Sequence, residues 1–211
     1  MKVVIFDMDG TLIDSQHDIT VSINHVRKER YKLEPLSNRY IVDAINSYER
    51  NLAELFYGTK VYHNEDRTLF ESHYHDQCIQ NPVLYSGIRE LLEMLGGMGV
   101  KSSVATNAPS PFARRMLEHL GVHDHFDHIF GADMVQNPKP DREMLHNILE
   151  RYGYDKSGDR AWMVGDNAKD MEAAKNAGIE GIFAAWGFSS EGEGDHFASH
   201  PEKILEIIAK G

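Results

Sequence analysis

Residues 3 to 12 are Val3-Val4-Ile5-Phe6-Asp7-Met8-Asp9-Gly10-Thr11-Leu12, an apolar run followed by two acids and a tight-turn sequence. Successive side chains of a strand point to opposite faces, so carboxylates at positions i and i+2 leave the strand end on the same side. Two acids in one small space resist joint ionisation unless a cation lies between them or one keeps its proton. The stretch therefore predicts a magnesium site, or a nucleophile paired with a general acid. A solvated acidic turn is the alternative for an isolated Asp-x-Asp-Gly.

The composition is that of a globular protein with one good hydrophobic core. The chain has 211 residues, of which 41% are hydrophobic, and a net charge of −11, which disfavours nucleic acids and anionic membranes as partners. No apolar run approaches the roughly 20 residues of a membrane span, and Met1-Lys2 leads directly into a strand-like run. The sequence thus predicts a cytoplasmic protein. Cys78 has no cysteine partner and is expected in a helix, buried or half-buried.

Four further apolar runs alternate with helix-like segments. The runs cover residues 103–105, 128–130, 161–164 and 181–185, and the helices are expected over 112–120, 142–152 and 170–177. This alternation predicts an α/β fold with a doubly wound parallel sheet and helices on both faces. Ligands of such a sheet bind beyond the carboxyl ends of its strands, which is where the candidate site residues lie.

The segment from residue 15 to residue 82 breaks this alternation. Ile19, Ile23 and Val26 recur at helical spacing, and so do apolar residues near 52–56 and 70–78. We expect an α/β core domain formed by residues 1–14 and 83–211, with a small all-helical cap domain over 15–82. Two neighbouring linkers would let the cap close over a bound substrate.

Polar residues follow the second and third predicted strands. Thr106-Asn107 comes after the second strand, and Ser110 with Pro111 suits the start of a helix, which predicts an anion site at that helix N-terminus. Lys139 lies between two prolines whose fixed φ angles hold the backbone extended and limit where the ammonium can go. By themselves these patterns are also compatible with an ordinary cap and with a surface lysine in a stiff turn.

Two more acids follow the fourth predicted strand. Asp166 and Asp170 are four residues apart and are expected to share one helix face, where they could hold a cation or a lysine. Together with Asp7 and Asp9 they would form a cluster of four acids. Burial of so many carboxylates is costly unless Mg²⁺ and a lysine balance them.

These four motifs, in this order, resemble those of the haloacid dehalogenase-like hydrolase superfamily. The counterparts are Asp7-Met8-Asp9-Gly10-Thr11 for the nucleophile loop, Thr106-Asn107 for the second motif, Lys139 within Asn137-Pro138-Lys139-Pro140 for the third, and Gly165-Asp166 through Asp170 for the fourth. The resemblance covers nearly the whole chain and is closest to the phosphoglycolate phosphatase-like branch, which carries an all-helical cap after the first motif. Trp186-Gly187 also follows the pattern of that branch.

The resemblance implies a Rossmann-like core and a Mg²⁺-dependent phosphatase that hydrolyses a small phosphomonoester, a phosphoglycolate-like metabolite, through an aspartyl-phosphate intermediate. Asp7 would be the nucleophile, and Asp9 would protonate the leaving alkoxide and then accept a proton from water. The Asp7 carboxylate, the Asp9 carbonyl and Asp166 would hold Mg²⁺, with Asp170 orienting Lys139 or a metal-bound water. The phosphoryl oxygens would be bound by Thr106, Asn107 and Lys139.

Departures from related branches narrow the choice of reaction. A dehalogenase would lack the second acid of the first motif, and a β-phosphoglucomutase-like enzyme would carry Glu-Asp in place of Gly165-Asp166. A phosphatase is therefore favoured. The alternatives are a phosphotransferase or phosphomutase of the same superfamily, and a non-catalytic protein that binds phosphate or metal.

The cap domain is expected to recognise the leaving group of the ester. Its candidates are Tyr48 and Arg50, with His17 and Asn46, although all four could instead be solvated residues at helix ends. The expected partner is a small phosphorylated metabolite, bound by a monomer or homodimer. Histidines of the cap, such as His73, are expected to be solvated or to pack rather than to bind metal.

Overall fold

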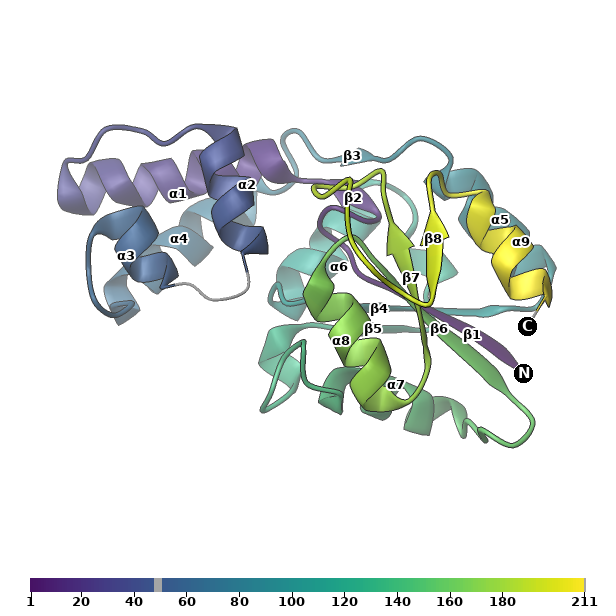
Figure 1. The fold of residues 1–211 in the computed structure, drawn as a ribbon. Coiled ribbons are helices and arrows are strands. Elements are labelled where there is room, and N and C mark those ends of the chain that lie inside the picture. The colour runs from purple at the N-terminus through teal and green to yellow at the C-terminus, as the bar shows by residue number, and fades with distance from the viewer. Residues whose placement is uncertain (48–50, 211) are drawn as a thin grey trace. The chain divides into compact units, whose positions relative to one another are not determined.

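The structure is a computed structural model that describes residues 1–47 and 51–210 (Figure 1). These residues divide into two compact units. The core unit comprises Met1–Asp14 and Leu84–Gly211, and the cap unit comprises Ser15–Val83. Within the described ranges, no helix combines the length and the apolar character that a bilayer span requires.

A six-stranded sheet forms the centre of the core unit, with the strand order β5-β4-β1-β6-β7-β8. Its strands are β1 (Lys2–Phe6), β4 (Lys101–Ala105), β5 (His128–Phe130), β6 (Arg160–Gly165), β7 (Glu180–Ala184) and β8 (His196–Ala198). All neighbouring pairs are parallel. Val3 to Phe6 are fully buried because both faces of a parallel sheet are covered. The predicted doubly wound α/β fold is confirmed.

Helices cover both faces of this sheet (Figure 1). One face carries α7 (Glu143–Tyr152) and α8 (Ala168–Ala177), whereas α5 (Ile88–Gly97), α6 (Ser110–His119) and α9 (Lys203–Lys210) lie on the other. Val3 and Ile5 point to the first face, where they pack in one cluster with apolar residues of α7 and α8. The alternation of side chains along β1 thus buries it between two helix layers.

The topology places the ends of β1 and β6 at a reversal of the strand order. From β1 the chain proceeds to β4 and β5 on one side, whereas β6 and β7 lie on the other side. The connections after β1 and β6 therefore diverge at the carboxyl ends of the two strands, which is where parallel sheets of this kind bind their ligands. Asp7 follows β1 and Asp166 follows β6, so both lie at this reversal of the strand order.

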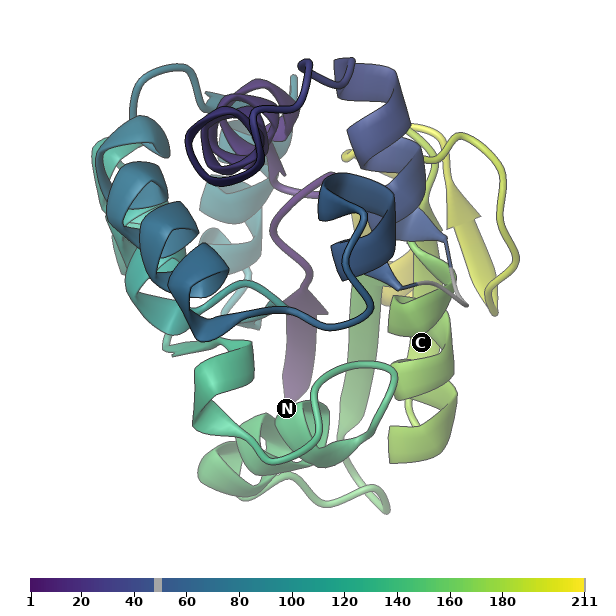
Figure 2. The ribbon, with the colours of Figure 1, turned by 90° about the vertical axis from the view of Figure 1, so that its left-hand side faces the viewer.

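In its described residues, 15–47 and 51–83, the cap unit has four helices around a small apolar core of its own. They are α1 (Gln16–Tyr31), α2 (Asn38–Asn46), α3 (Leu52–Tyr57) and α4 (Asn64–Gln77). Figure 2 views α1 along its axis, with α4 on one side of it and α2 and α3 on the other. Ile23 and Val26 of α1 pack against Ile41 of α2 and Phe56 of α3. Cys78 is buried directly after the end of α4.

Two short strands mark the points where the chain leaves the core unit and returns to it. β2 (Ile13–Asp14) and β3 (Val83–Leu84) pair in a separate two-stranded sheet. Next to them, the N–H of Tyr85 donates a hydrogen bond to the carbonyl of Leu12 at 3.1 Å. Backbone hydrogen bonds therefore tie the two crossing segments to each other.

Candidate active site

The first motif forms a tight turn directly beyond β1. The carbonyl of Met8 accepts hydrogen bonds from the N–H groups of Thr11, Leu12 and Ile13, and the N–H of Asp7 donates to the carbonyl of Val164 at 2.8 Å. Because the strand ends at Phe6, strand alternation does not govern the two acids. Asp7 is buried, with 8% of its surface exposed, whereas Asp9 is half-buried.

Lys139 lies between two carboxylates in the interior. Its Nζ donates to Asp7 Oδ1 at 2.7 Å and to Asp170 Oδ1 at 2.6 Å, and only 4% of Lys139 is exposed. Burial alone would lower the pKa of Lys139, but the charges and hydrogen bonds of Asp170 and Asp7 outweigh it and raise this pKa above its usual value. Lys139 is therefore a buried cation rather than a surface lysine.

Asn107 holds the backbone of Lys139 in place. Its Oδ1 accepts the N–H of Lys139 at 3.0 Å, and its Nδ2 donates to the carbonyl of Lys139 at 2.9 Å. The side chain of Asn107 thus pairs with both the backbone N–H and the backbone carbonyl of Lys139. This arrangement makes Asn107 a positioning residue for the ammonium, in addition to its predicted place near the phosphoryl group.

Asp166 and Asp170 converge from two different elements. Asp166 follows β6, and Asp170 lies in the first turn of α8, where its Oδ2 accepts the N–H of Asn167 at 3.2 Å in a capping box. They therefore do not share a helix face, as the four-residue spacing had suggested, because α8 begins only at Ala168. A Cβ at Gly165 would overlap the Asp170 carboxyl, so this close approach requires glycine.

Three of the four predicted acids form one buried group. Oxygen atoms of Asp7, Asp166 and Asp170 all lie within 4.8 Å of one another, and among the described residues this group does not include the Asp9 carboxylate. Burial and the charges of Asp7 and Asp170 raise the pKa of Asp166 well above its usual value. Burial likewise raises the pKa of Asp170 to about 7, although Lys139 opposes this shift. The excess of negative charge can be balanced by a divalent cation.

Thr106 and the start of α6 lie at the end of β4. Thr106 is buried and its Oγ1 accepts the N–H of Ala108 at 3.0 Å. The N–H and Oγ of Ser110 donate to the two carboxylate oxygens of Asp133 at 2.6 and 2.8 Å. The anion expected at this helix N-terminus is thus a carboxylate of the chain itself, a residue that no motif had indicated.

The structure places only part of the predicted cap site. Tyr48 and Arg50 lie outside the described residues. His17 is exposed in the first turn of α1, and Asn46 is the half-buried last residue of α2.

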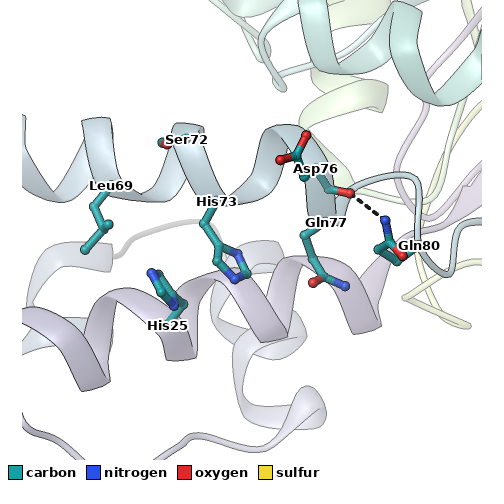
Figure 3. A pocket seen from close by; sticks show the side chains of 7 residues that line it. All are labelled: His25, Leu69, Ser72, His73, Asp76, Gln77 and Gln80. Atoms are coloured by element: carbon teal, nitrogen blue, oxygen red, sulfur yellow. Dashed lines mark hydrogen bonds between the residues drawn. The ribbon is translucent and has the colours of Figure 1, made fainter.

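A separate cavity of about 360 Å³ lies within the cap unit between α1 and α4 (Figure 3). It is lined by His25, Leu69, Ser72, His73, Asp76, Gln77 and Gln80. The rings of His25 and His73 stack, with centroids 4.1 Å apart, and Nδ1 of His73 lies 2.9 Å from Ser22 Oγ. Burial and the neighbouring His25 lower the pKa of His73, so the neutral ring packs between the helices.

Comparison with known proteins identifies the family to which this arrangement belongs. The family described as haloacid dehalogenase-like hydrolase matches residues 4–184, which include all four motifs. The chain belongs to the haloacid dehalogenase-like hydrolase family. Within this family it is a phosphatase, a phosphoric monoester hydrolase.

Relatives of this haloacid dehalogenase-like hydrolase match over almost its entire length. It is 33% identical to a phosphoglycolate phosphatase from Aquifex aeolicus, with 99% of this chain and 97% of the relative covered. It is 27% identical to an N-acetylmuramic acid 6-phosphate phosphatase from Pseudomonas aeruginosa, with coverage of 99% and 95%. A haloacid dehalogenase-like hydrolase from Streptococcus pneumoniae shares the fold, with a TM-score of 0.81, 24% identity and coverage of 98% and 97%.

Proposed function

We propose that this protein is a Mg²⁺-dependent phosphatase that hydrolyses a small phosphomonoester, of the phosphoglycolate type, through an aspartyl phosphate on Asp7. The observation that carries this proposal is the contact of Asp7 with Lys139 inside a buried group of acids. A carboxylate that pairs with a buried ammonium is held in position to attack phosphorus, and the ammonium balances its negative charge. The relationship to the Aquifex aeolicus phosphoglycolate phosphatase supports the substrate class.

The donor set fits Mg²⁺. Three carboxylates with one ammonium leave an excess of two negative charges when all are ionised, and carboxylate oxygens are the hard ligands that Mg²⁺ prefers. Asp7, Asp166 and the backbone carbonyl of Asp9 would hold the ion, with Asp170 orienting Lys139. When bound, the ion supplies positive charge that stabilises the transferring phosphoryl group.

The chain's own residues would then perform two displacements at phosphorus. In the first, an Asp7 carboxylate oxygen bonds to phosphorus, the bond to the ester oxygen breaks, and Asp9 donates a proton to the departing alkoxide. In the second, Asp9 takes a proton from water, the water oxygen bonds to phosphorus and the bond to Asp7 breaks. Lys139 and Thr106 hold the phosphoryl oxygens, and Asn107 fixes the backbone of Lys139.

The cap unit would determine which ester is hydrolysed. Tyr48 and Arg50 are the residues for which we propose contacts with the leaving group. The two relatives above are named for esters of different size, a two-carbon acid and an amino sugar, which supports recognition of the leaving group apart from the phosphoryl chemistry. We further expect action in the cytoplasm, as a monomer or homodimer, without nucleic-acid or membrane partners.

Phosphate release from an aryl phosphate, measured with and without Mg²⁺, tests the reaction. We expect Asp7→Asn to lower kcat more than about 1000-fold while the protein stays folded, because the amide is a poor nucleophile. Asp124→Asn is the matched control, since the Asp124 side chain is fully exposed and pairs with the neighbouring His123. Wild-type release by Asp7→Asn, or full activity in excess chelator, would contradict the proposal.

A further inference from the structure

The segment that follows β7 contacts two of the active-site loops at once. The indole Nε1 of Trp186 donates a hydrogen bond to the carbonyl of Thr11 at 2.9 Å, and the N–H of Phe188 donates to Asp166 Oδ2 at 2.7 Å. Thr11 in turn lies next to the same carboxylate, with its Oγ1 3.4 Å from Asp166 Oδ1. Both oxygens of Asp166 are therefore held by neighbours, one by the nucleophile loop and one by the segment after β7.

Gly187 brings the two backbones into direct contact. A Cβ at this position would overlap the carbonyl oxygen of Gly10 and would lie 2.5 Å from the Cβ of Asp166. A side chain larger than hydrogen would therefore push the segment away from both the nucleophile loop and Asp166. The close approach brings Trp186 and Phe188 within hydrogen-bonding distance on either side of Gly187.

We propose that Trp186 is a positioning residue, which acts through Thr11 and the Phe188 N–H to fix the Asp166 carboxylate before a divalent cation binds. This inference rests on the proposed function, because it assigns Asp166 to the cation. Outer residues that orient a metal-binding carboxylate commonly contribute 10- to 100-fold to metal affinity. The indole N–H is the part of Trp186 that we assign to this positioning, since it joins the segment after β7 to the turn that carries Asp7 and Thr11.

Calorimetric titration with Mg²⁺, without substrate, measures this role independently of turnover. Trp186→Phe keeps an aromatic ring but removes the N–H, and we expect it to raise the Kd for Mg²⁺ by about tenfold. Trp162→Phe is the matched control, because it also removes one indole hydrogen bond, the 3.2 Å contact with Glu180, away from the acid cluster. At saturating Mg²⁺ the kcat of Trp186→Phe should recover toward the wild-type value.

Thr11 provides a second pair of variants in case Trp186→Phe fails to fold. Thr11→Val removes the hydroxyl beside Asp166 and should weaken Mg²⁺ binding, whereas Thr11→Ser keeps it and should restore binding. Wild-type Mg²⁺ affinity in both Trp186→Phe and Thr11→Val, or equal weakening in Trp162→Phe, would overturn the proposal. Weakened binding in a protein whose wild type releases no phosphate would support this positioning role and contradict the phosphatase mechanism instead.

Discussion

The ammonium of Lys139 balances charge that burial makes costly. Asp7 and Asp170 each lie within 2.7 Å of its Nζ, and all three side chains are almost fully shielded from water. Transfer of an ion into a protein interior costs several kcal/mol unless a partner compensates for it. The same lysine that is proposed to bind the phosphoryl group therefore also stabilises the folded core.

Substitution of Lys139 by Met should lower both activity and stability. Met has a similar length but no charge, so Asp7 and Asp170 would be left buried without their cation, which typically costs about 3–5 kcal/mol. Urea unfolding of the metal-free protein measures this loss. Lys101→Met is the control, because Lys101 pairs with Asp127 at 3.6 Å in a largely exposed ion pair and should change stability by less than about 1 kcal/mol. Equal losses of unfolding free energy in the two variants would show that burial of the ion pair does not affect its contribution to stability.

The sequence motifs identified the residues of the acid cluster but not all of their contacts. The pattern Pro-Lys-Pro predicted a restricted lysine, and the structure brings it to Asp7 and Asp170. The pairing of Asn107 with the Lys139 backbone and that of Ser110 with Asp133 depend on loops that meet only in three dimensions. Local sequence spacing carries no signal for such contacts.

At the scale of elements, helices α1 and α4 meet through a pair of stacked histidines. His25 belongs to α1 and His73 to α4, and among the residues that the structure describes Asp76 is the other charged group that lines their cavity (Figure 3). Burial and His25 lower the pKa of His73, whereas Asp76 opposes this shift. The folded protein therefore binds a proton at His73 less readily than the unfolded chain does.

This pKa shift predicts that acid weakens the packing of α1 against α4. Above about pH 6.5, His73 is neutral in both states and its full contribution to the free energy of unfolding is present. As pH falls below this value, the unfolded chain takes up the proton more readily than the folded protein, so the free energy of unfolding decreases. Thermal melting between pH 8 and pH 5.5 should show a smaller decrease for His73→Gln than for the wild type. His75→Gln, altered at a largely exposed histidine of the same helix, should retain the wild-type pH dependence. A wild-type slope in His73→Gln would disprove this role.

The strands and helices that the sequence predicts are those with a clear pattern of apolar residues. The five apolar runs correspond to β1, β4, β5, β6 and β7; β5 has its predicted bounds, and the ends of the other strands are displaced by at most two residues. β8 was not predicted because its Phe197 is 53% exposed, so the strand lacks the signature of one that is buried on both faces. Helix α8 begins two residues before its predicted start, because Asn167 caps it ahead of the apolar pattern.

At the scale of the whole molecule, the proposed function divides its tasks between the two units. All residues of the acid cluster, together with Lys139 and Thr106, belong to the core unit. The residues that we propose for recognition of the leaving group lie between 15 and 82. Such a division means that phosphoryl chemistry and substrate choice respond to different substitutions.

Tyr48→Ala and Arg50→Ala should therefore change the substrate preference rather than the chemistry. We expect kcat/KM to fall about tenfold or more on phosphoglycolate but only about twofold on an aryl phosphate, whose leaving group needs little help. Steady-state kinetics on both esters provide the measurement. Arg39→Ala is the control, since Arg39 is 93% exposed on α2 and pairs with Asp43 of the same helix. Equal losses on both esters, or none on either, would place specificity elsewhere.

The pairing of β2 with β3 also bears on how such a protein can diversify. Because the chain leaves the core unit at Asp14 and returns at Leu84 through two hydrogen-bonded strands, the ends of the intervening segment are neighbours. An ancestral gene could lengthen, shorten or exchange this segment as a cassette while β1 kept its register with β4 and β6. Under the proposed function, such an exchange would change the choice of substrate through two junctions that are neighbours in the folded chain, and it would leave the acid cluster unchanged.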